Sequence, residues 1–189
     1  VIHLMVLGRL RWRKPRAAIP RKIGHAAFDF DAGTLLLTEQ GTKKRASLHL
    51  VRGEQGLDDL YPGGLELAGA SVEAFRCAMT RTNHTLKRAL TDPRILSGIG
   101  NAYSDEILHR AKLSPFKLTD KVDDETWGRL LATCNEVLTE WTVRLRDEVG
   151  DGFPDKVTAF RDGMAVHGKY RQPCPVCSTK VQRIRYADN

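Results

Sequence analysis

The sequence predicts an α+β protein in which a β-rich first part of the chain is followed by a mostly helical part and a short cysteine-bearing end. Three observations support this fold class. Strand-forming patterns occupy the first 52 residues, apolar residues recur at helical spacing between residues 71 and 146, and Cys174 and Cys177 form a Cys-x-x-Cys pair. A chain of 189 residues with 41% hydrophobic residues is long enough for one or two domains with a real core.

Residues 1–52 are interpreted as part of a β-sandwich. The predicted strands are Val1 to Leu10, Ala26 to Phe30 and Thr34 to Thr38 around an Asp31-Ala32-Gly33 turn, and Ala46 to Val51. The second and third of these strands are expected to form a hairpin. Because the chain opens on Val1 directly in a strand, we expect a preceding segment of the sandwich to be missing from this sequence.

A linker and a helical region follow. Residues 53–67 are rich in glycine and aspartate and include Tyr61-Pro62-Gly63-Gly64, which is typical of a linker. In the helical region, residues 68–163, Ser71 is predicted to cap a first helix, and a long amphipathic helix follows the acidic residues 123–125 and ends near Arg146. Cys77 and Cys134 occur singly in helical patterns and are expected to be buried as small apolar residues.

The stretch from Leu86 to Phe116 carries the clearest functional signal. It predicts a short helix that ends near Asp92-Pro93, a tight turn through residues 97–100, and a second helix from about Asn101 to Ala111. Gly98 and Gly100 suit the turn, and Asn101 suits the cap of the second helix. The unpaired N–H groups and the positive dipole end of that helix favour a phosphate. Gly-Ile-Gly alone is a weak signal, because helix-hairpin-helix modules, RNA-binding ribosomal proteins and ordinary helix ends use the same turn.

The longer run RILSGIGNAYSDEIL, residues 94–108, followed by Ala111, Leu113 and Pro115, resembles the helix-two-turn-helix of the formamidopyrimidine-DNA glycosylase/endonuclease VIII family. The resemblance covers nearly all of the chain. It implies that residues 1–52 are the remainder of an N-terminal β-sandwich catalytic domain, that residues 68–163 are a helix-two-turn-helix DNA-binding domain, and that residues 164–189 are an incomplete zinc-finger hairpin.

The same resemblance implies base-excision repair of damaged double-stranded DNA. Members of the family bend the duplex, flip out an oxidised base and attack the sugar C1′ with the secondary amine of an N-terminal proline; the Schiff base then permits AP lyase elimination. Here the first prolines, Pro15 and Pro20, are internal tertiary amides and cannot act as that nucleophile. We therefore predict no catalytic residue in this stretch, and we expect residues 1–189 to bind DNA without cleaving it.

Six residues are predicted to contact DNA. Asn101, with Gly100 and the amides of the turn, is the first choice, and Lys87 on the preceding helix is a weaker one. His3 lies in HLMVLGRL, residues 3–10, which resembles a family strand whose histidine touches a phosphate. Lys44 and Arg45 match a basic pair that precedes the family's aromatic wedge, a position filled here by Ala46. Without the resemblance, these side chains would be interpreted as a satisfied strand histidine, a solvated loop and an exposed helix lysine.

Cys174 and Cys177 have the spacing of two ligands of a tetrahedral zinc ion, which is half a site. The resemblance implies a hairpin with such a pair at each end, and only the first pair occurs here, so His167 would have to serve as a fallback ligand. A gap-free alignment places Asn189 where the family has a phosphate-binding arginine, with Arg183 and Arg185 nearby. A thiol-redox pair is an alternative, although no βαβ pattern surrounds it.

Charge is distributed unevenly along the chain. Residues 1–52 carry a net charge of +8, residues 53–155 a net charge of −6 and residues 156–189 a net charge of +5. Basic ends of this kind suit a protein that contacts a polyanion with both of them. The predicted partner is damaged duplex DNA, bound by a monomer in the bacterial cytoplasm, and no apolar run has membrane-spanning length. The competing function is a non-enzymatic nucleic-acid-binding module of the ribosome-associated type.

Overall fold

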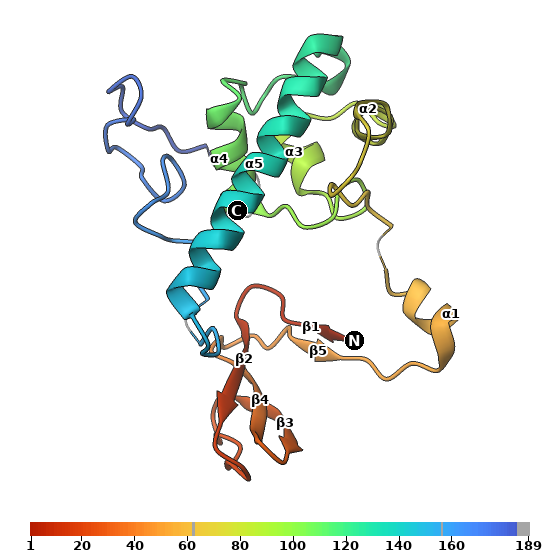
Figure 1. The fold of residues 1–189 in the computed structure, drawn as a ribbon, viewed down its shortest axis with the longest axis vertical. Helices are drawn as coiled ribbons and strands as arrows, with labels where there is room; N and C mark the ends of the chain where they lie inside the picture. The colour runs from red at the N-terminus through yellow and green to blue at the C-terminus, as the bar shows by residue number, and fades with distance from the viewer. Residues whose placement is uncertain (62, 156, 185–189) are drawn as a thin grey trace. The chain divides into compact units, whose positions relative to one another are not determined.

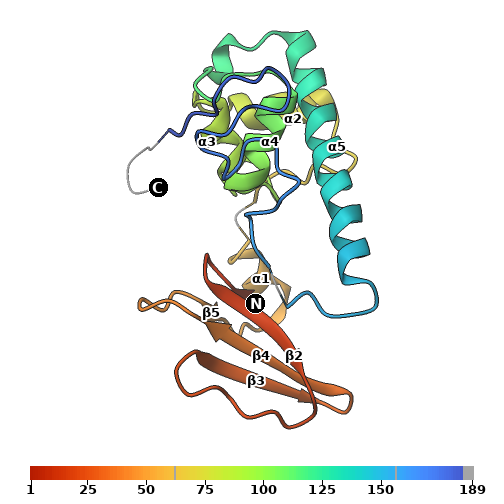
Figure 2. The same ribbon diagram turned by 90° about the vertical axis from the view of Figure 1, so that its left-hand side faces the viewer.

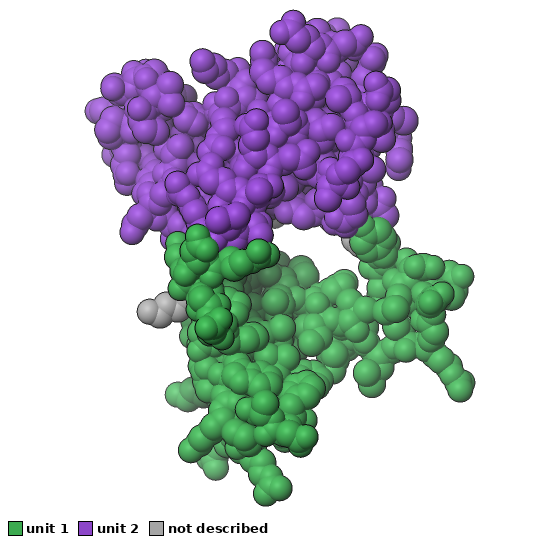
Figure 3. Space-filling model, in the orientation of Figure 1, with its two compact units in different colours: residues 1–61, 146–157 green, residues 62–145, 158–189 purple. Residues whose placement is uncertain are grey.

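The computed structural model describes residues 1–61, 63–155 and 157–184, and its chain divides into two compact units. The first unit comprises Val1–Tyr61 and Arg146–Val157, and the second comprises Pro62–Leu145 and Thr158–Asn189 (Figure 3). The first unit contains the strands and the second contains most of the helices (Figure 1). The predicted α+β class is confirmed. The predicted helical region, residues 68–163, spans the boundary between the two units, since Arg146–Val157 is grouped with the strands.

The first unit is built from two antiparallel sheets. Strands β2 (Gly8–Arg13), β4 (Gly33–Glu39) and β3 (Gly24–Phe30) form a three-stranded sheet in the order β2-β4-β3 (Figure 2). Strand β1 (Ile2–His3) pairs with β5 (Ser47–Leu48) (Figure 1). The predicted hairpin is present, with Phe30 opposite Gly33 at its closed end. Along the edge strand β2, Trp12 packs against Phe30 and Phe153. These contacts join residues 146–157 to the sheet.

The predicted first strand, Val1 to Leu10, is interrupted. Residues 4–7 form a turn in which the Gly8 N–H donates to Leu4 O over 2.8 Å and Met5 has a φ of 51°. The residues before and after the turn pair with different strands, so the turn sends the chain from one sheet to the other. The segment predicted as a linker also contains a short helix, α1 (Gly53–Asp58), with no buried residue.

The second unit is organised around helices α2 (Val72–Thr80), α3 (Leu86–Thr91), α4 (Asn101–Arg110) and α5 (Asp124–Val149), with a 3-10 turn, η1 (Thr119–Lys121), before α5. Ser71 caps α2 as predicted, since its Oγ accepts the N–H of Ala74. The apolar stripe of α5 faces the core, as predicted. Side chains that are fully buried in this core include Phe75, Met79, Leu86, Leu90, Leu96, Ile107, Trp127, Leu130 and Val137.

The two single cysteines differ from each other. Cys134 is buried in α5, as predicted, and burial raises the pKa of its thiol to about 12. Cys77 is exposed, and the prediction of burial was wrong. The reason is helical geometry, because Cys77 lies two residues after the core residue Phe75 and therefore on the opposite side of α2.

The chain after α5 has little regular secondary structure. Met164 is buried in the helical core, and a narrow hairpin follows, with an antiparallel bridge between Pro173 and Lys180. Arg171 donates its N–H to Val181 O, and Cys174 donates its N–H to Thr179 O. Figures 1 and 2 both show this segment beside α4. Over the residues that the structure describes, no helix is both long and apolar enough to cross a membrane.

Candidate nucleic-acid interface

The turn between α3 and α4 is fixed at its start by Asp92, the C-cap residue of α3. Its carboxylate accepts the Arg94 N–H over 2.9 Å and the Arg94 guanidinium over 3.0 and 2.7 Å. These bonds to Arg94 lower the pKa of Asp92 from 3.8 to about 2. The main-chain oxygen of Asp92 accepts the N–H groups of Ile95 and Leu96, and Ser97 donates its N–H to Leu65 O. The backbone therefore enters the glycine turn along a defined path.

Gly98 and Gly100 have different roles in this turn. Gly98 has a φ of +83°, in the left-handed region that side chains disfavour, so the backbone itself requires glycine there. Gly100 has a φ of −109° and a ψ of −172°, which any residue adopts. Apart from its two chain neighbours, no described residue has an atom within 4 Å of the place where its Cβ would be. Neither the backbone nor the packing of the described residues requires glycine at position 100. Its lack of a side chain leaves the start of α4 open.

No side chain caps the N-terminus of α4. Asn101 was predicted as the cap, but the N-cap is Gly100, and Asn101 is the first helical residue. The Asn101 side chain is exposed, and within the described ranges it has no hydrogen-bond partner. An exposed amide side chain and uncapped main-chain N–H groups therefore lie together at one helix start, an arrangement that favours an anion.

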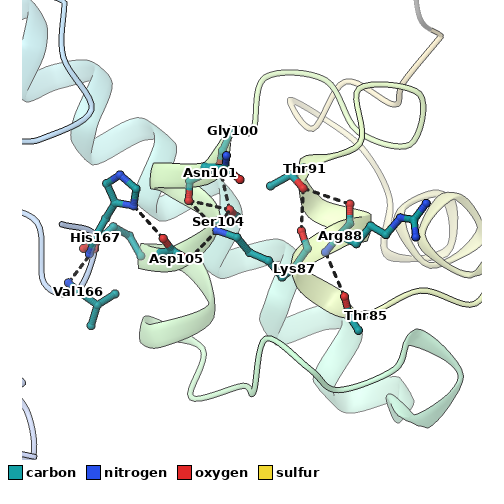
Figure 4. Close-up of polar contacts among 11 residues, drawn as sticks. Thr85, Lys87, Arg88, Thr91, Gly100, Asn101, Ser104, Asp105, Val166 and His167 are labelled. Atoms are coloured by element: carbon teal, nitrogen blue, oxygen red, sulfur yellow. Dashed lines mark hydrogen bonds and ion pairs between the residues drawn. The ribbon is translucent and has the colours of Figure 1, made fainter. Parts of the chain in front are cut away.

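The carbonyl groups of this turn are hydrogen-bonded to side chains of the protein. The single Ser104 O–H is shared between Gly100 O and Asn101 O, over 2.9 and 3.0 Å, and the Lys87 ammonium donates to Asn101 O over 2.7 Å (Figure 4). In a trans peptide the C=O and N–H groups point in opposite directions. Fixing these two oxygens therefore directs the N–H groups of Asn101 and Ala102 out of the helix start.

The Lys87 ammonium binds groups of the protein itself, on the first turns of α4. Besides Asn101 O, the ammonium contacts Ser104 Oγ over 2.8 Å and Asp105 Oδ1 over 2.5 Å, and the Lys87 side chain is 27% exposed. Figure 4 shows Lys87 extended from α3 towards the first turn of α4. Its charge is paired with the Asp105 carboxylate, so its role at the helix start is to hold the Asn101 carbonyl. Direct contact of Lys87 with DNA stays a prediction.

The remaining predicted DNA contacts lie in the first unit. His3 is exposed on β1, with its ring centroid 5.2 Å from that of His49. Lys44 and Arg45 are exposed in the loop after β4, and the Lys44 ammonium donates to the main-chain oxygen of Glu39. Gly100, Asn101 and Lys87 are thus brought together in the second unit, and His3, Lys44 and Arg45 belong to the other unit.

Glu39 shapes the loop that carries Lys44 and Arg45, and sequence reasoning missed it. Its carboxylate is only 2% exposed and accepts the N–H of Arg45 over 2.9 and 3.0 Å and that of Ala46 over 3.2 Å. The Arg45 N–H is the main cause that lowers the pKa of Glu39, and His25, 3.4 Å away, acts in the same direction. A lone acid at the end of an apolar strand was the only signal in the sequence.

The cysteine pair supplies two sulfur ligands at most from the described residues. Val176 donates its N–H to Cys174 Sγ over 3.4 Å, and hydrogen bonds from Thr179 and then from Cys174 lower the pKa of Cys177. No group of three or more potential metal-binding side chains occurs within residues 1–61, 63–155 and 157–184. The residues fit half of a tetrahedral zinc site.

The two histidines near the hairpin are placed differently from the prediction. His167, predicted as a fallback ligand, has its Nδ1 2.8 Å from Asp105 Oδ2. His109 lies beside the cysteines, with Nε2 3.2 Å from Cys174 Sγ, and sequence reasoning missed it. Arg183 lies over the Tyr170 ring, 4.7 Å from its centroid, whereas Arg185 and Asn189 lie outside the described residues.

Comparison with known proteins identifies similar sequences over the whole chain. A family model described as the formamidopyrimidine-DNA glycosylase H2TH domain matches residues 66–148. A formamidopyrimidine-DNA glycosylase of Heliobacterium modesticaldum is 32% identical over 199 residues, which cover 99% of this chain and 70% of the relative. An uncharacterized formamidopyrimidine-DNA glycosylase-like protein of Mycobacterium tuberculosis is 39% identical over 103 residues, which cover 54% of this chain and 63% of that relative.

Solved structures with a similar fold include complexes with DNA. A complex of the LlFpg protein with a THF-DNA and an inhibitor has a TM-score of 0.83 at 22% identity and covers 100% of this chain and 70% of that one. A complex of the Lactococcus lactis Fpg with an abasic site containing DNA has a TM-score of 0.80 at 23% identity, with the same coverage. At this level of identity, the likeness supports the fold.

The two glycines of the turn should respond differently to alanine. We expect Gly98→Ala to destabilise the protein by about 1 kcal/mol or more, because a side chain is strained at a φ of +83°. Gly100→Ala should leave the free energy of unfolding unchanged or raise it slightly, because the site is open and the backbone is ordinary. Denaturant unfolding of both variants measures this difference. Equal losses of unfolding free energy in the two variants would contradict the different roles of the two glycines.

Acid should remove the contribution of Asp92. Its pKa is lower in the folded protein than the ordinary value, so its stabilisation is full above pH 3.8 and is lost as pH falls through about 2. The stability difference between the wild type and Asp92→Asn should therefore shrink over that window. Unfolding curves at several pH values measure it. Asp124→Asn, which alters a carboxylate that is 80% exposed, is the matched control and should show a small difference throughout.

Proposed function

The chain belongs to the formamidopyrimidine-DNA glycosylase family, and from that premise we propose that it binds damaged double-stranded DNA in the repair of oxidised bases. The substrate class follows from the family. Relatives with this name, and solved complexes with abasic-site DNA, support it. We propose that this activity takes place in the bacterial cytoplasm.

The observation that carries the proposal is the open start of α4. Two main-chain N–H groups are directed outwards because the carbonyls of the same peptides are hydrogen-bonded to the protein. Among the described residues the Asn101 amide has no hydrogen-bond partner, and Gly100 presents no side chain to a guest. A phosphate oxygen is the anion that a nucleic acid offers at such a site. We propose that this turn binds one phosphate of the DNA backbone.

The first unit carries its own basic residues. His3, Lys44 and Arg45 are exposed. The loop that carries Lys44 and Arg45 is held by Glu39, whose carboxylate accepts main-chain N–H groups of that loop. We propose these three side chains as further phosphate contacts. Charged contacts of this kind supply sequence-independent affinity that falls with salt concentration.

The family reaction needs a nucleophile that these 189 residues do not contain. In the proposed glycosylase/AP lyase reaction, an N-terminal proline nitrogen attacks the sugar C1′, the base departs with the electron pair of the glycosidic bond, and elimination from the resulting Schiff base breaks the strand. Pro15 and Pro20 are internal, so their nitrogens carry no available lone pair. We propose that residues 1–189 provide DNA binding alone.

Zinc would have a structural task. We propose Cys174 and Cys177 as two of its ligands, since the pair lies on one tight turn with an N–H directed at Cys174 Sγ. A structural zinc site is tetrahedral and needs two more ligands. When bound, the ion supplies a cross-link that stabilises the hairpin.

Removing the open helix start should weaken DNA binding without unfolding the protein. We expect Gly100→Ala and Asn101→Ala each to raise the Kd for a duplex with an abasic-site analogue by about tenfold, which corresponds to about 1.4 kcal/mol. Fluorescence anisotropy at one fixed salt concentration measures this. Asn135→Ala, which removes an amide that bonds only within α5, is the matched control and should bind as the wild type does. Unchanged affinity in both turn variants would refute the phosphate site.

The absence of the nucleophile is tested by borohydride trapping. Residues 1–189, incubated with an abasic-site duplex and borohydride, should form no covalent adduct and leave the strand intact, while binding remains measurable. The reason is that no N-terminal proline amine is present to form the Schiff base. A trapped adduct would show that another amine of this stretch reacts, and would overturn the division between binding and chemistry.

A further inference from the structure

Glu106 is a buried carboxylate that the proposed DNA contact does not use. It is 7% exposed, and it accepts main-chain N–H groups from three consecutive residues of the C-terminal segment. Oε2 accepts from Ala165 over 2.7 Å, and Oε1 accepts from Val166 and His167 over 2.9 Å each. A buried charge is costly unless it is hydrogen-bonded, and three donors satisfy this one. The contact therefore specifies one position for residues 165–167 on α4.

Asp105, the neighbouring residue, connects the same segment to the helix start. Its Oδ2 is 2.8 Å from His167 Nδ1, and its Oδ1 is 2.5 Å from the Lys87 ammonium. That ammonium also holds Asn101 O. Figure 4 shows Asp105 between His167 on one side and Lys87 on the other. One carboxylate thus touches both the C-terminal segment and the group that orients the turn.

One helical turn further along α4, His109 reaches the hairpin itself. Its Nε2 lies 3.2 Å from the sulfur of Cys174, the buried cysteine of the pair. Positions 105, 106 and 109 lie on one side of a helix. Met164, which directly precedes the anchored residues in the sequence, is buried in the helical core. The segment from Met164 to Cys174 is therefore attached to the second unit over its first four residues, 164–167, and again at its end, at Cys174.

We propose that Glu106 is a positioning residue that anchors residues 165–167, and with them the cysteine hairpin, to the helix that binds the DNA phosphate. The anchor consists of a carboxylate and main-chain amides, so it holds the root of the hairpin whether or not a metal is bound. Its consequence for DNA rests on the proposed function. The hairpin carries Lys169, Arg171, Lys180 and Arg183, and the anchor fixes where these charges lie relative to the α4 helix start.

The first test is amide hydrogen exchange of the 189-residue chain without DNA, in the presence of a metal chelator. The wild type should protect the amides of residues 165–167. Glu106→Gln should speed their exchange by at least about tenfold, because one oxygen becomes an NH₂ group that faces an N–H donor. Glu140→Gln is the matched control, since Glu140 is on α5 and pairs with Arg110 and Arg144 at the surface. It should leave this protection unchanged.

Two outcomes of that experiment would overturn the anchor. One is wild-type amides at residues 165–167 that exchange freely in chelator, and the other is protection in Glu106→Gln equal to that of the wild type. Glu106→Asp retains the charge at shorter reach and should exchange more slowly than Glu106→Gln. If both variants lower the melting temperature, Glu106→Asp must still exchange more slowly than Glu106→Gln at residues 165–167. This comparison separates loss of the anchor from a general loss of stability.

The second test measures duplex binding as a function of salt. Releasing the hairpin should make the dependence of log K on log salt shallower in Glu106→Gln, because its basic residues no longer neutralise phosphates at fixed positions. A purely structural role would not change this slope. A wild type that fails to bind duplex refutes the proposed function and leaves the exchange result standing. Binding with an unchanged slope in Glu106→Gln overturns the link between the anchor and DNA.

Discussion

The direction of two peptide groups at the start of α4 governs the rest of the site. The oxygens of Gly100 and Asn101 accept hydrogen bonds from Ser104 and Lys87, and this fixes the N–H groups of the same peptides on the outer side. An anion-binding helix start needs donors that no internal side chain occupies, and α4 meets this condition. Asp92 and Arg94 fix the chain before the turn, and Lys87 joins α3 to α4 after it. The outward direction of the Asn101 and Ala102 N–H groups therefore depends on hydrogen bonds that other groups of the turn make.

Helix α4 also joins the two parts of the second unit that the sequence separates most widely. Its first turn faces outwards, and its middle binds residues 165–167 through Glu106 and Asp105. A loop with little secondary structure would normally be the least ordered part of such a chain. Here three consecutive main-chain N–H groups donate to one buried carboxylate, and these hydrogen bonds hold the loop in place. Because the cysteine hairpin follows residues 165–167 directly in the chain, this contact also positions the hairpin.

Local features of this structure could be predicted from sequence, and long-range ones could not. The turn at Gly98, the extent of α4 and the cap at Ser71 depend on neighbouring residues, and each was predicted to within about a residue. The break at residues 4–7 depends on which strand each half pairs with, which the sequence does not state. The same limit explains why His167 was expected near the cysteines while His109 is found there. Helix α4 and the hairpin are 65 residues apart at that contact.

The distribution of charge shows why net charge alone misjudges this surface. Residues 53–155 carry a formal net charge of −6, which would repel DNA if every carboxylate faced solvent. Around the helix start, however, the acids are engaged within the protein, because Asp92 binds Arg94, Asp105 binds Lys87 and Glu106 binds main-chain amides. The groups exposed at the turn include the main-chain N–H donors, the neutral Asn101 amide and the Arg94 side chain, which is 75% exposed. A phosphate approaching Gly100 therefore meets donors rather than carboxylates, even though this part of the chain is acidic by composition.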